Sequence, residues 1–292
     1  MSRPRRLLTS RAFYSNILGV YEKYITEYFG YDKVLPMNSG AEADETALKL
    51  CRKWAYKVKG IEDGKAKIIV CEGNFHGRTI TIISMSTDPD SYGGFGPATP
   101  GLFTVPYNDL AALEAALADP DVAGFLVEPI QGEAGVFVPD EGYLAKAYEL
   151  CKKNNVLFIA DEVQTGIART GKLLCDHENV RPDILILGKA LSGRLCRYLR
   201  GNTGRRRELC SPLNKANMDQ PLLVTMAGRV AIAALEVVKK KNWLKKLNTL
   251  GKYSARLSSV KSEMIELVRG KGVAECRGDP GPKMASKRGM SV

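Results

Sequence analysis

Two residues of this sequence, the acid Asp161 and the amine Lys189, occupy positions typical of catalytic groups. Each follows a short apolar run, at 156–160 and at 184–188. Such runs are typical of buried parallel strands, and the sites of open α/β sheets lie at the carboxyl ends of those strands. A lysine and an aspartate at one sheet edge suit an enzyme that uses pyridoxal phosphate (PLP): the lysine condenses with the cofactor, and the aspartate keeps its pyridine nitrogen protonated. From these two residues alone, a structural ion pair or two solvated strand ends remain alternatives.

The elements around these residues alternate between strand and helix, as a doubly wound, mostly parallel sheet requires. We expect strands at 34–37, 66–71, 102–105, 123–127, 156–160 and 184–187, and helices at 44–57, 110–117, 143–154, 230–238 and 253–268. The small residues at 38–41, which precede the first helix, form either a cradle for a phosphate group or an ordinary helical turn. The expected organisation is a large α/β domain over 1–240 and a partial smaller domain over 241–292 with an unstructured tail.

Composition narrows the class of protein. The chain has 292 residues, of which 45% are hydrophobic, and no apolar run approaches the roughly 18 residues that suggest a membrane span. Seven cysteines without a C-x-x-C pair indicate reduced thiols, in the cytoplasm or the mitochondrial matrix. An arginine-rich start is compatible with a mitochondrial transit peptide, and the compartment stays undecided. We therefore expect a soluble protein that does not enter a membrane.

The net charge of +11 raises the question of nucleic-acid binding. The basic excess lies at the first residues, at 194–228 and at 269–292, without interleaved aromatic residues for base stacking, so we expect no nucleic-acid partner. The near match to a phosphate-binding loop at 166–172 continues with Leu173 where Ser or Thr is needed. Two histidines and no G-x-S-x-G motif also argue against a catalytic metal and a serine hydrolase, and we expect no metal.

Seven segments, taken in order, resemble the class III PLP-dependent aminotransferases, and most closely the branch that acts on ornithine. They are residues 8–14, 36–43, 74–79, 127–135, 158–166, 169–172 and 187–193. The resemblance runs from residue 8 to 193 and returns at 229–272. It implies the type I fold of PLP-dependent transferases, a homodimer, and transfer of the δ-amino group of L-ornithine to 2-oxoglutarate. Other class III substrates, acetylornithine and 4-aminobutyrate, are the alternatives within the family.

The resemblance also implies a role for each matching cofactor residue. Lys189 would carry the cofactor and move the proton between substrate and cofactor, and Asp161 would pair with the pyridine nitrogen. Phe75 would stack on one face of the ring and Val163 would pack on the other. Gln164 would donate a hydrogen bond to the phenolic oxygen.

Four further positions complete the site that the resemblance implies. The backbone amides of Gly40 and Ala41 would bind the cofactor phosphate. Arg78 would bind a substrate carboxylate. Glu133 would pair with a second arginine that recognises 2-oxoglutarate.

The sequence departs from the family in three places. It begins just before the motif at 8–14, it loses the family's pattern over 194–228, and it leaves the pattern after 272. Residues 194–228 have neither helical nor strand periodicity and contain an arginine run, so we expect a divergent segment, for which disorder and a shifted reading frame are the hypotheses. The alternative function is therefore a truncated or frameshifted family member that does not catalyse the reaction.

Overall fold

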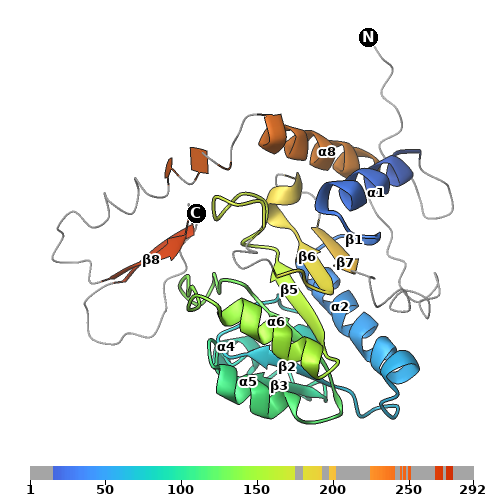
Figure 1. The fold of residues 1–292 in the computed structure, drawn as a ribbon, viewed down its shortest axis with the longest axis vertical. Coiled ribbons are helices and arrows are strands. Elements are labelled where there is room, and N and C mark those ends of the chain that lie inside the picture. Colours follow the sequence, from blue (N-terminus) through green and yellow to red (C-terminus); the bar gives the residue numbers. More distant parts are fainter. Residues whose placement is uncertain are drawn as a thin grey trace.

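A seven-stranded sheet forms the centre of the molecule (Figure 1). The computed structural model describes residues 16–174, 180–192, 197–201, 224–240, 244, 246–247, 249–250, 267–271 and 274–278. Along the sheet the strands are β1 (Lys33–Met37), β7 (Arg197–Gly201), β6 (Ile184–Leu187), β5 (Leu157–Glu162), β4 (Val122–Val127), β2 (Lys67–Cys71) and β3 (Leu102–Val105). From β6 to β3 all neighbours are parallel, and β7 is antiparallel to β1 and β6. The expected α/β fold with a mostly parallel sheet is confirmed.

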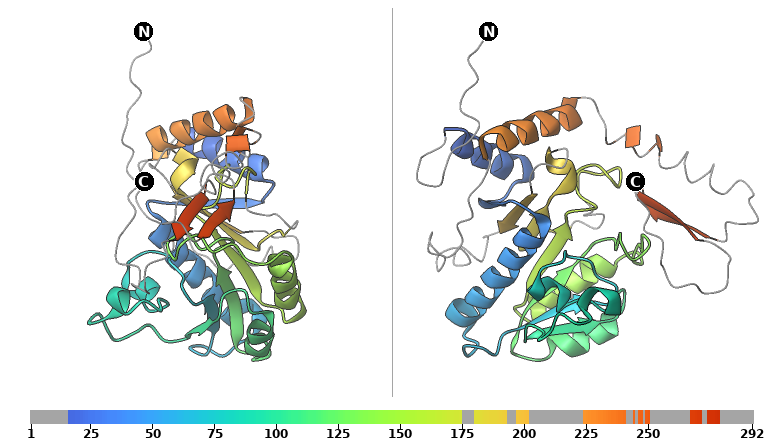
Figure 2. Two further views of the ribbon diagram at one scale, coloured as in Figure 1. Left: turned by 90° about the vertical axis from the view of Figure 1, so that its left-hand side faces the viewer. Right: turned by 180° about the vertical axis from the view of Figure 1, so that it is seen from behind.

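Helices cover both faces of this sheet (Figures 1 and 2). The long helix α2 packs on one face, and α5 and α6 pack on the other. At one end of the sheet, α1 lies against α8. The helical elements are α1 (Asn16–Phe29), α2 (Gly40–Trp54), the π-helical turn η1 (Ala55–Lys59), α3 (Ile80–Ile83), α4 (Pro89–Tyr92), α5 (Leu110–Leu117), α6 (Tyr143–Lys153), the 3₁₀ turn η2 (Lys189–Ser192) and α8 (Val224–Lys240).

The central strands explain why the sequence shows continuous apolar runs. In β5, Leu157 and Ile159 contribute to the core under α2, whereas Phe158 and Ala160 contribute to the core under α5 and α6. Since both faces of a parallel strand are covered, neither set of alternating side chains needs to be polar. Asp161 continues the α2 side of this alternation, and Glu162 continues the other side.

Glycine lets α2 come close to the sheet. A Cβ atom on Gly124 of β4 would lie 2.6 Å from Sγ of Cys51 in α2 and 3.3 Å from Cδ1 of Ile159 in β5. Even the smallest side chain at residue 124 would therefore displace α2 from the strands. This close packing fixes where the first turn of α2 lies relative to the strand ends.

Two expectations about the second half of the chain were wrong. Residues 194–228 were expected to lack regular structure, but β7 occupies 197–201 and α8 begins at Val224. Hydrogen bonding to strands on both sides gives β7 a partner for each edge, and this pairing outweighs a weak local pattern. The helix expected at 253–268 does not continue to its last residues, since β8 (Leu267–Lys271) pairs antiparallel with β9 (Ala274–Gly278).

Several other expectations lie outside the described part of the chain. These are the motif at 8–14, most of the divergent segment and the tail beyond residue 278. The division into domains at residue 240 stays a prediction. In the described residues, no helix has both the length and the hydropathy needed to cross a membrane.

Candidate functional site

A cavity of about 150 Å³ opens where the carboxyl ends of the parallel strands meet the first turn of α2. Side chains come from the segments after β2 and β4, from the end of β5 and the residues just after it, and from Lys189, two residues after the end of β6. This is the position at which open α/β sheets bind ligands. The lining residues are Gly40, Ala41, Asp44, Phe75, His76, Gly77, Glu128, Glu133, Asp161, Val163, Gln164 and Lys189.

The first turn of α2 offers backbone amides to this cavity. Ser39 caps the helix, and its Oγ accepts a hydrogen bond from the amide of Glu42 at 3.1 Å. The helix therefore begins at Gly40, four residues earlier than the expected start at 44. Because first-turn amides have no partner within a helix and the helix dipole is positive there, Gly40 and Ala41 lie where an anion is bound favourably.

Gly77 allows the loop after β2 to approach that turn. Its φ of +129° belongs to glycine, and a Cβ atom added to it would lie 2.6 Å from Cβ of Ala41. No such contact occurs between real side chains without displacement of one of them. The sequence thus requires glycine at 77 for reasons of both conformation and space.

Asp161 is buried, with 5% of its surface exposed, and each of its oxygens accepts a hydrogen bond. Oδ1 accepts from the backbone amide of Val163 at 2.9 Å, and Oδ2 is 2.7 Å from Nδ1 of His76. Hydrogen bonds to a carboxylate favour its ionised form. A carboxylate offers about four lone-pair sites, so Asp161 can still accept a bond from a ligand.

Lys189 reaches the same cavity from the first residue of η2. Its Nζ donates a hydrogen bond to Oε1 of Gln164 at 2.8 Å and lies 3.8 Å from Oε1 of Glu133. The backbone of Lys189 has a φ of +37°, a conformation rare outside glycine, which marks the turn that ends β6. The structure thus brings together Lys189, Gln164 and Glu133, which the sequence predicted for the site.

The remaining predicted residues lie at different distances from the cavity. Phe75, which is half-buried, and Val163, which is buried, both line it. Arg78 is exposed and lies outside the lining, with its guanidinium carbon 6.0 Å from the centre of the Phe75 ring. The structure therefore brings every predicted cofactor residue to one cavity and leaves Arg78 beside it.

Besides Gly77, three lining residues were not predicted, namely Asp44, His76 and Glu128. Each had a signal in the sequence. His76 and Glu128 lie inside motifs at 74–79 and 127–135, and Asp44 follows Gly40 by one helical turn, which places it on the same face of α2. An analysis of strand ends alone misses Asp44, which is in a helix, and His76, which is in a loop.

Glu128 adds a second buried carboxyl group. Its Oε2 accepts a hydrogen bond from the backbone amide of Phe75 at 3.0 Å. Burial raises the pKa of Glu128 to about 7, an effect that the charge of His76 opposes and the charge of Asp161 reinforces. The cavity therefore holds a carboxyl group that can change its charge near neutral pH.

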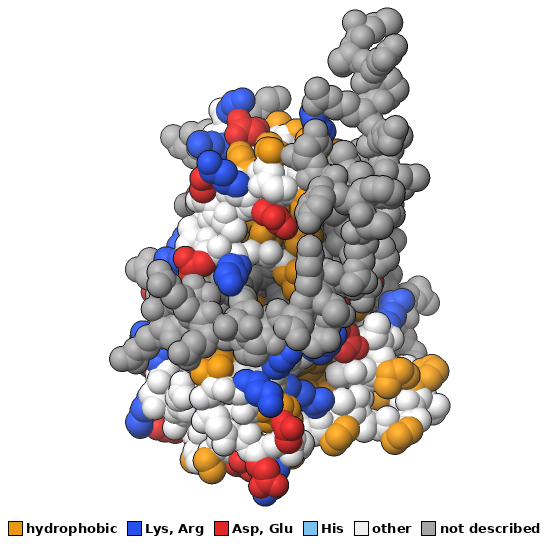
Figure 3. Space-filling model, turned by 90° about the vertical axis from the view of Figure 1, so that its right-hand side faces the viewer, with side chains coloured by type: hydrophobic (Ala, Val, Ile, Leu, Met, Phe, Trp, Pro, Cys, Tyr) orange, Lys and Arg blue, Asp and Glu red, His pale blue; other side chains and the backbone are white. Residues whose placement is uncertain are grey.

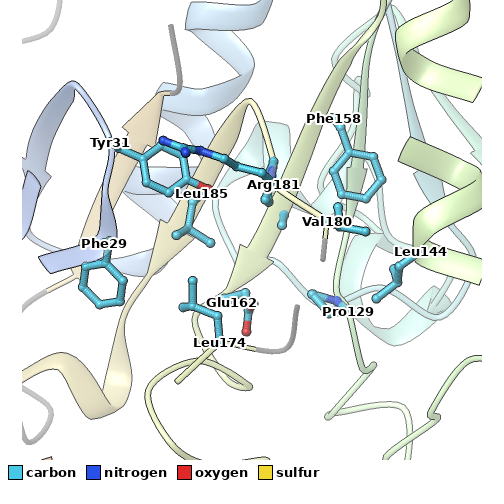
Figure 4. Close-up of a pocket in the computed structure, with 12 residues that line it drawn as sticks. Phe29, Tyr31, Pro129, Leu144, Phe158, Glu162, Leu174, Val180, Arg181 and Leu185 are labelled. Carbon is cyan, nitrogen blue, oxygen red and sulfur yellow. The ribbon is translucent and has the colours of Figure 1, made fainter. Parts of the chain in front are cut away.

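A larger cavity of about 260 Å³ lies on the opposite face of β5 (Figure 4). Most of its lining is apolar, and the buried carboxylate of Glu162 accepts a hydrogen bond from Thr165. Arg181 lies beside the ring of Tyr31, with 5.1 Å between the guanidinium carbon and the ring centre. No lysine is among the described residues that line it, so the smaller cavity is the one equipped for chemistry on a carbonyl compound.

This fold and site define a class III aminotransferase, and the chain belongs to that family. The family model for aminotransferase class III matches residues 5–277. The chain is 52% identical over 282 residues to the mitochondrial ornithine aminotransferase of Rattus norvegicus, covering 91% of this chain and 61% of that protein. It is 62% identical over 187 residues to the ornithine aminotransferase of Plasmodium chabaudi chabaudi, covering 64% of this chain and 45% of that protein.

Solved structures agree with this assignment. The crystal structure of the ornithine aminotransferase from Toxoplasma gondii superimposes with a TM-score of 0.87 at 44% identity, covering 93% of this chain and 66% of that chain. The acetylornithine aminotransferase of Elizabethkingia anophelis gives a TM-score of 0.79 at 47% identity, with 94% and 66% covered. The chain thus spans less than two thirds of the length of these relatives.

The contact between Gly77 and Ala41 predicts the effect of Gly77→Ala. The added methyl group strains the backbone and displaces the first turn of α2, so we expect a loss of about 1–3 kcal/mol in stability and weaker binding of PLP. The matched control is Gly94→Ala, because residue 94 also has a positive φ, of +79°, but has open space around it. Urea unfolding and PLP titration of both variants measure the effect. Equal losses in the two variants would contradict this account.

The raised pKa of Glu128 predicts a pH-dependent effect of Glu128→Gln. The folded protein binds this proton more tightly than the unfolded chain, so the penalty for burying ionised Glu128 is absent below its ordinary value of 4.5 and grows as the pH rises toward about 7. Glu128→Gln should therefore gain stability relative to the parent protein on going from pH 5 to pH 8, by about 3 kcal/mol at most. Urea unfolding of the PLP-free proteins at both pH values measures this difference. Glu141→Gln, at an exposed position, is the control, and a difference independent of pH would refute the prediction.

Proposed function

We propose that the protein is an ornithine aminotransferase: it binds PLP and transfers the δ-amino group of L-ornithine to 2-oxoglutarate, giving glutamate 5-semialdehyde and glutamate. The observation that carries the proposal is the presence of Lys189 and Asp161 in one cavity at the ends of adjacent strands. The ornithine aminotransferases among the relatives support the choice of substrate.

The residues of the cavity fit PLP. Gly40 and Ala41 provide first-turn amides for its phosphate, and the glycine at 77 lets the loop that carries Phe75 pack closely against Ala41. Asp161 offers an anionic acceptor for a protonated ring nitrogen, and Phe75 and Val163 offer apolar contacts for an aromatic ring. When bound, the cofactor supplies an electron sink for the carbon that loses its proton.

In this proposal Lys189 has two tasks, both at its Nζ atom. Nζ would hold the cofactor covalently, and as a free amine it would take the proton from the substrate carbon and later give it back. Gln164 accepts a hydrogen bond from Nζ, so it would orient the amine while Lys189 is not bonded to the cofactor.

Substrate binding is assigned to the residues around the mouth of the cavity. Arg78 is exposed beside Phe75 and would pair with a substrate carboxylate. Glu133 is exposed near Nζ of Lys189. Its carboxylate would form an ion pair with a cationic group of the substrate or with a second arginine. Acetylornithine and 4-aminobutyrate stay alternative substrates, since they differ from ornithine only at the end that these residues would contact.

We also propose a homodimer in the mitochondrial matrix or the cytoplasm. The relatives with the word mitochondrial in their names favour the matrix. The segment that carries α3 and α4 projects from the body of the molecule (Figure 2). It exposes 56% of Ile80, 45% of Tyr92 and 56% of Phe95, large apolar side chains of the kind that a subunit interface covers.

Positive and negative side chains are mixed on the face drawn in Figure 3. A binding surface for nucleic acid is usually continuous and basic. We propose small molecules as the ligands of this protein, and no nucleic-acid partner.

Absorbance of the protein with PLP tests the proposal. We expect a band in the near-visible range in the parent protein and its loss in Lys189→Ala, with production of glutamate semialdehyde from ornithine falling at least a thousandfold because the proton carrier is gone. Lys152→Ala, at an exposed helix position, should keep both signals.

The outcome also separates the alternatives. If PLP gives no band that depends on Lys189, the chain is a non-catalytic member of its family and the proposal fails. If the band appears but acetylornithine or 4-aminobutyrate reacts faster than ornithine, only the choice of substrate is wrong.

A further inference from the structure

We propose that His76 is a positioning residue, which holds Asp161 ionised and oriented toward the ring nitrogen of the cofactor. This inference rests on the proposed PLP-dependent function. It assigns a task to a side chain that does not itself have to touch the cofactor.

The contact between the two side chains is short and buried. Nδ1 of His76 is 2.7 Å from Oδ2 of Asp161, and the imidazole side chain has no exposed surface. The other oxygen of Asp161 is held by the amide of Val163. With one donor on each oxygen, the plane of the carboxylate is fixed, so the direction of its remaining lone pairs is fixed too.

The imidazole of His76 is surrounded by carboxyl groups. Carboxyl groups face it from three elements: Asp44 from α2, Asp161 from β5 and Glu128 from the segment after β4. Lys189, on η2, is the other described basic residue that lines the cavity. Burial by itself lowers the pKa of His76, but the hydrogen bond to Asp161 and the charges of Asp161 and Glu128 outweigh burial and raise it.

Loss of the imidazole would change how protons are shared in this cluster. Three neighbouring carboxyl groups in a buried place repel one another, and protonation of one of them relieves the repulsion. Protonated Asp161 would no longer be an anion facing the ring nitrogen. His76 therefore supplies both the donor to Asp161 and the positive charge that offsets this repulsion.

A metal site is the competing explanation for the same cluster. Ligand atoms of Asp44, His76 and Asp161 lie within 4.8 Å of one another. However, the nitrogen nearest to both carboxylates is Nδ1, which is 3.9 Å from Oδ1 of Asp44 and at hydrogen-bonding distance from Asp161. A metal ion on Nδ1 would have to replace that hydrogen bond, so the geometry favours the positioning role.

Two substitutions separate a positioning role from a structural one. His76→Phe removes the donor and the charge, whereas His76→Asn keeps a neutral donor near the place of Nδ1. Tyr143→Phe is the control, because Tyr143 is equally buried but contributes to the core on the other face of the sheet. The measurements are the affinity for PLP from pH 5.5 to 9 and the unfolding temperature of the PLP-free proteins.

The expected result is a change in both the strength and the pH profile of PLP binding. His76→Phe should bind PLP at least tenfold more weakly, and its affinity should begin to fall at a higher pH than that of the parent protein. His76→Asn should recover part of the affinity at pH 9 and lose it again toward acid. Tyr143→Phe should leave the profile unchanged.

Three outcomes overturn the inference. One is an unchanged pH profile in His76→Phe, even if affinity and unfolding temperature both fall, since this indicates a structural role. Another is tight binding of Zn²⁺ alone by the parent protein that His76→Asn abolishes. The third is the absence of any Lys189-dependent PLP band in the parent protein, which overturns the proposed function together with the inference, whereas the first two leave the proposed function standing.

Discussion

The burial of a carboxylate at the end of a central strand is the constraint on which the site depends. An ionised group in such a place costs several kcal/mol unless its oxygens are bonded and a positive charge is near. Asp161 meets this requirement through Val163, which follows the end of its own strand, and through His76, which lies in the loop after β2. That loop brings His76 to Asp161 because Gly77 allows it to pack on Ala41. The conformation of two loops and the position of the first turn of α2 therefore determine how Asp161 is bonded.

The two faces of the sheet differ in function: one contributes mainly to the hydrophobic core, and the other also carries the candidate site. On the α5 and α6 side, β5 contributes Phe158 and Ala160 to a core of aromatic and aliphatic side chains. On the α2 side, the same strand contributes Leu157 and Ile159 to the core and then presents Asp161 at its end. The larger cavity, on the first side, has a mostly apolar lining with Glu162 and Arg181, whereas the smaller one has Lys189 and several carboxyl groups. Volume is thus a poorer guide to function here than the chemistry of the lining residues.

Much of this arrangement could be predicted from the sequence because its causes are local. The buried parallel strands appear as short apolar runs, and the polar residues that end them, such as Asp161 and Lys189, are set at the sheet edge by geometry. Arg78 was expected to bind a substrate carboxylate and lies beside the cavity, outside its lining; the sequence cannot show how such a long exposed side chain is directed. The pairing of Asp161 with His76 joins residues 85 positions apart and depends on how a loop packs, which no local pattern contains. For the same reason β7 was missed: its strand conformation comes from partners on both sides.

The central claim, that Lys189 is the residue to which PLP is joined, can be tested by chemical trapping. Borohydride reduction makes the bond between PLP and a lysine amine permanent, and mass spectrometry of the digested protein then locates the label. We predict that, at stoichiometric PLP, the label is found on the peptide that contains Lys189 and is absent from those with exposed lysines such as Lys49. A label spread over exposed lysines, with none on Lys189, would contradict the account.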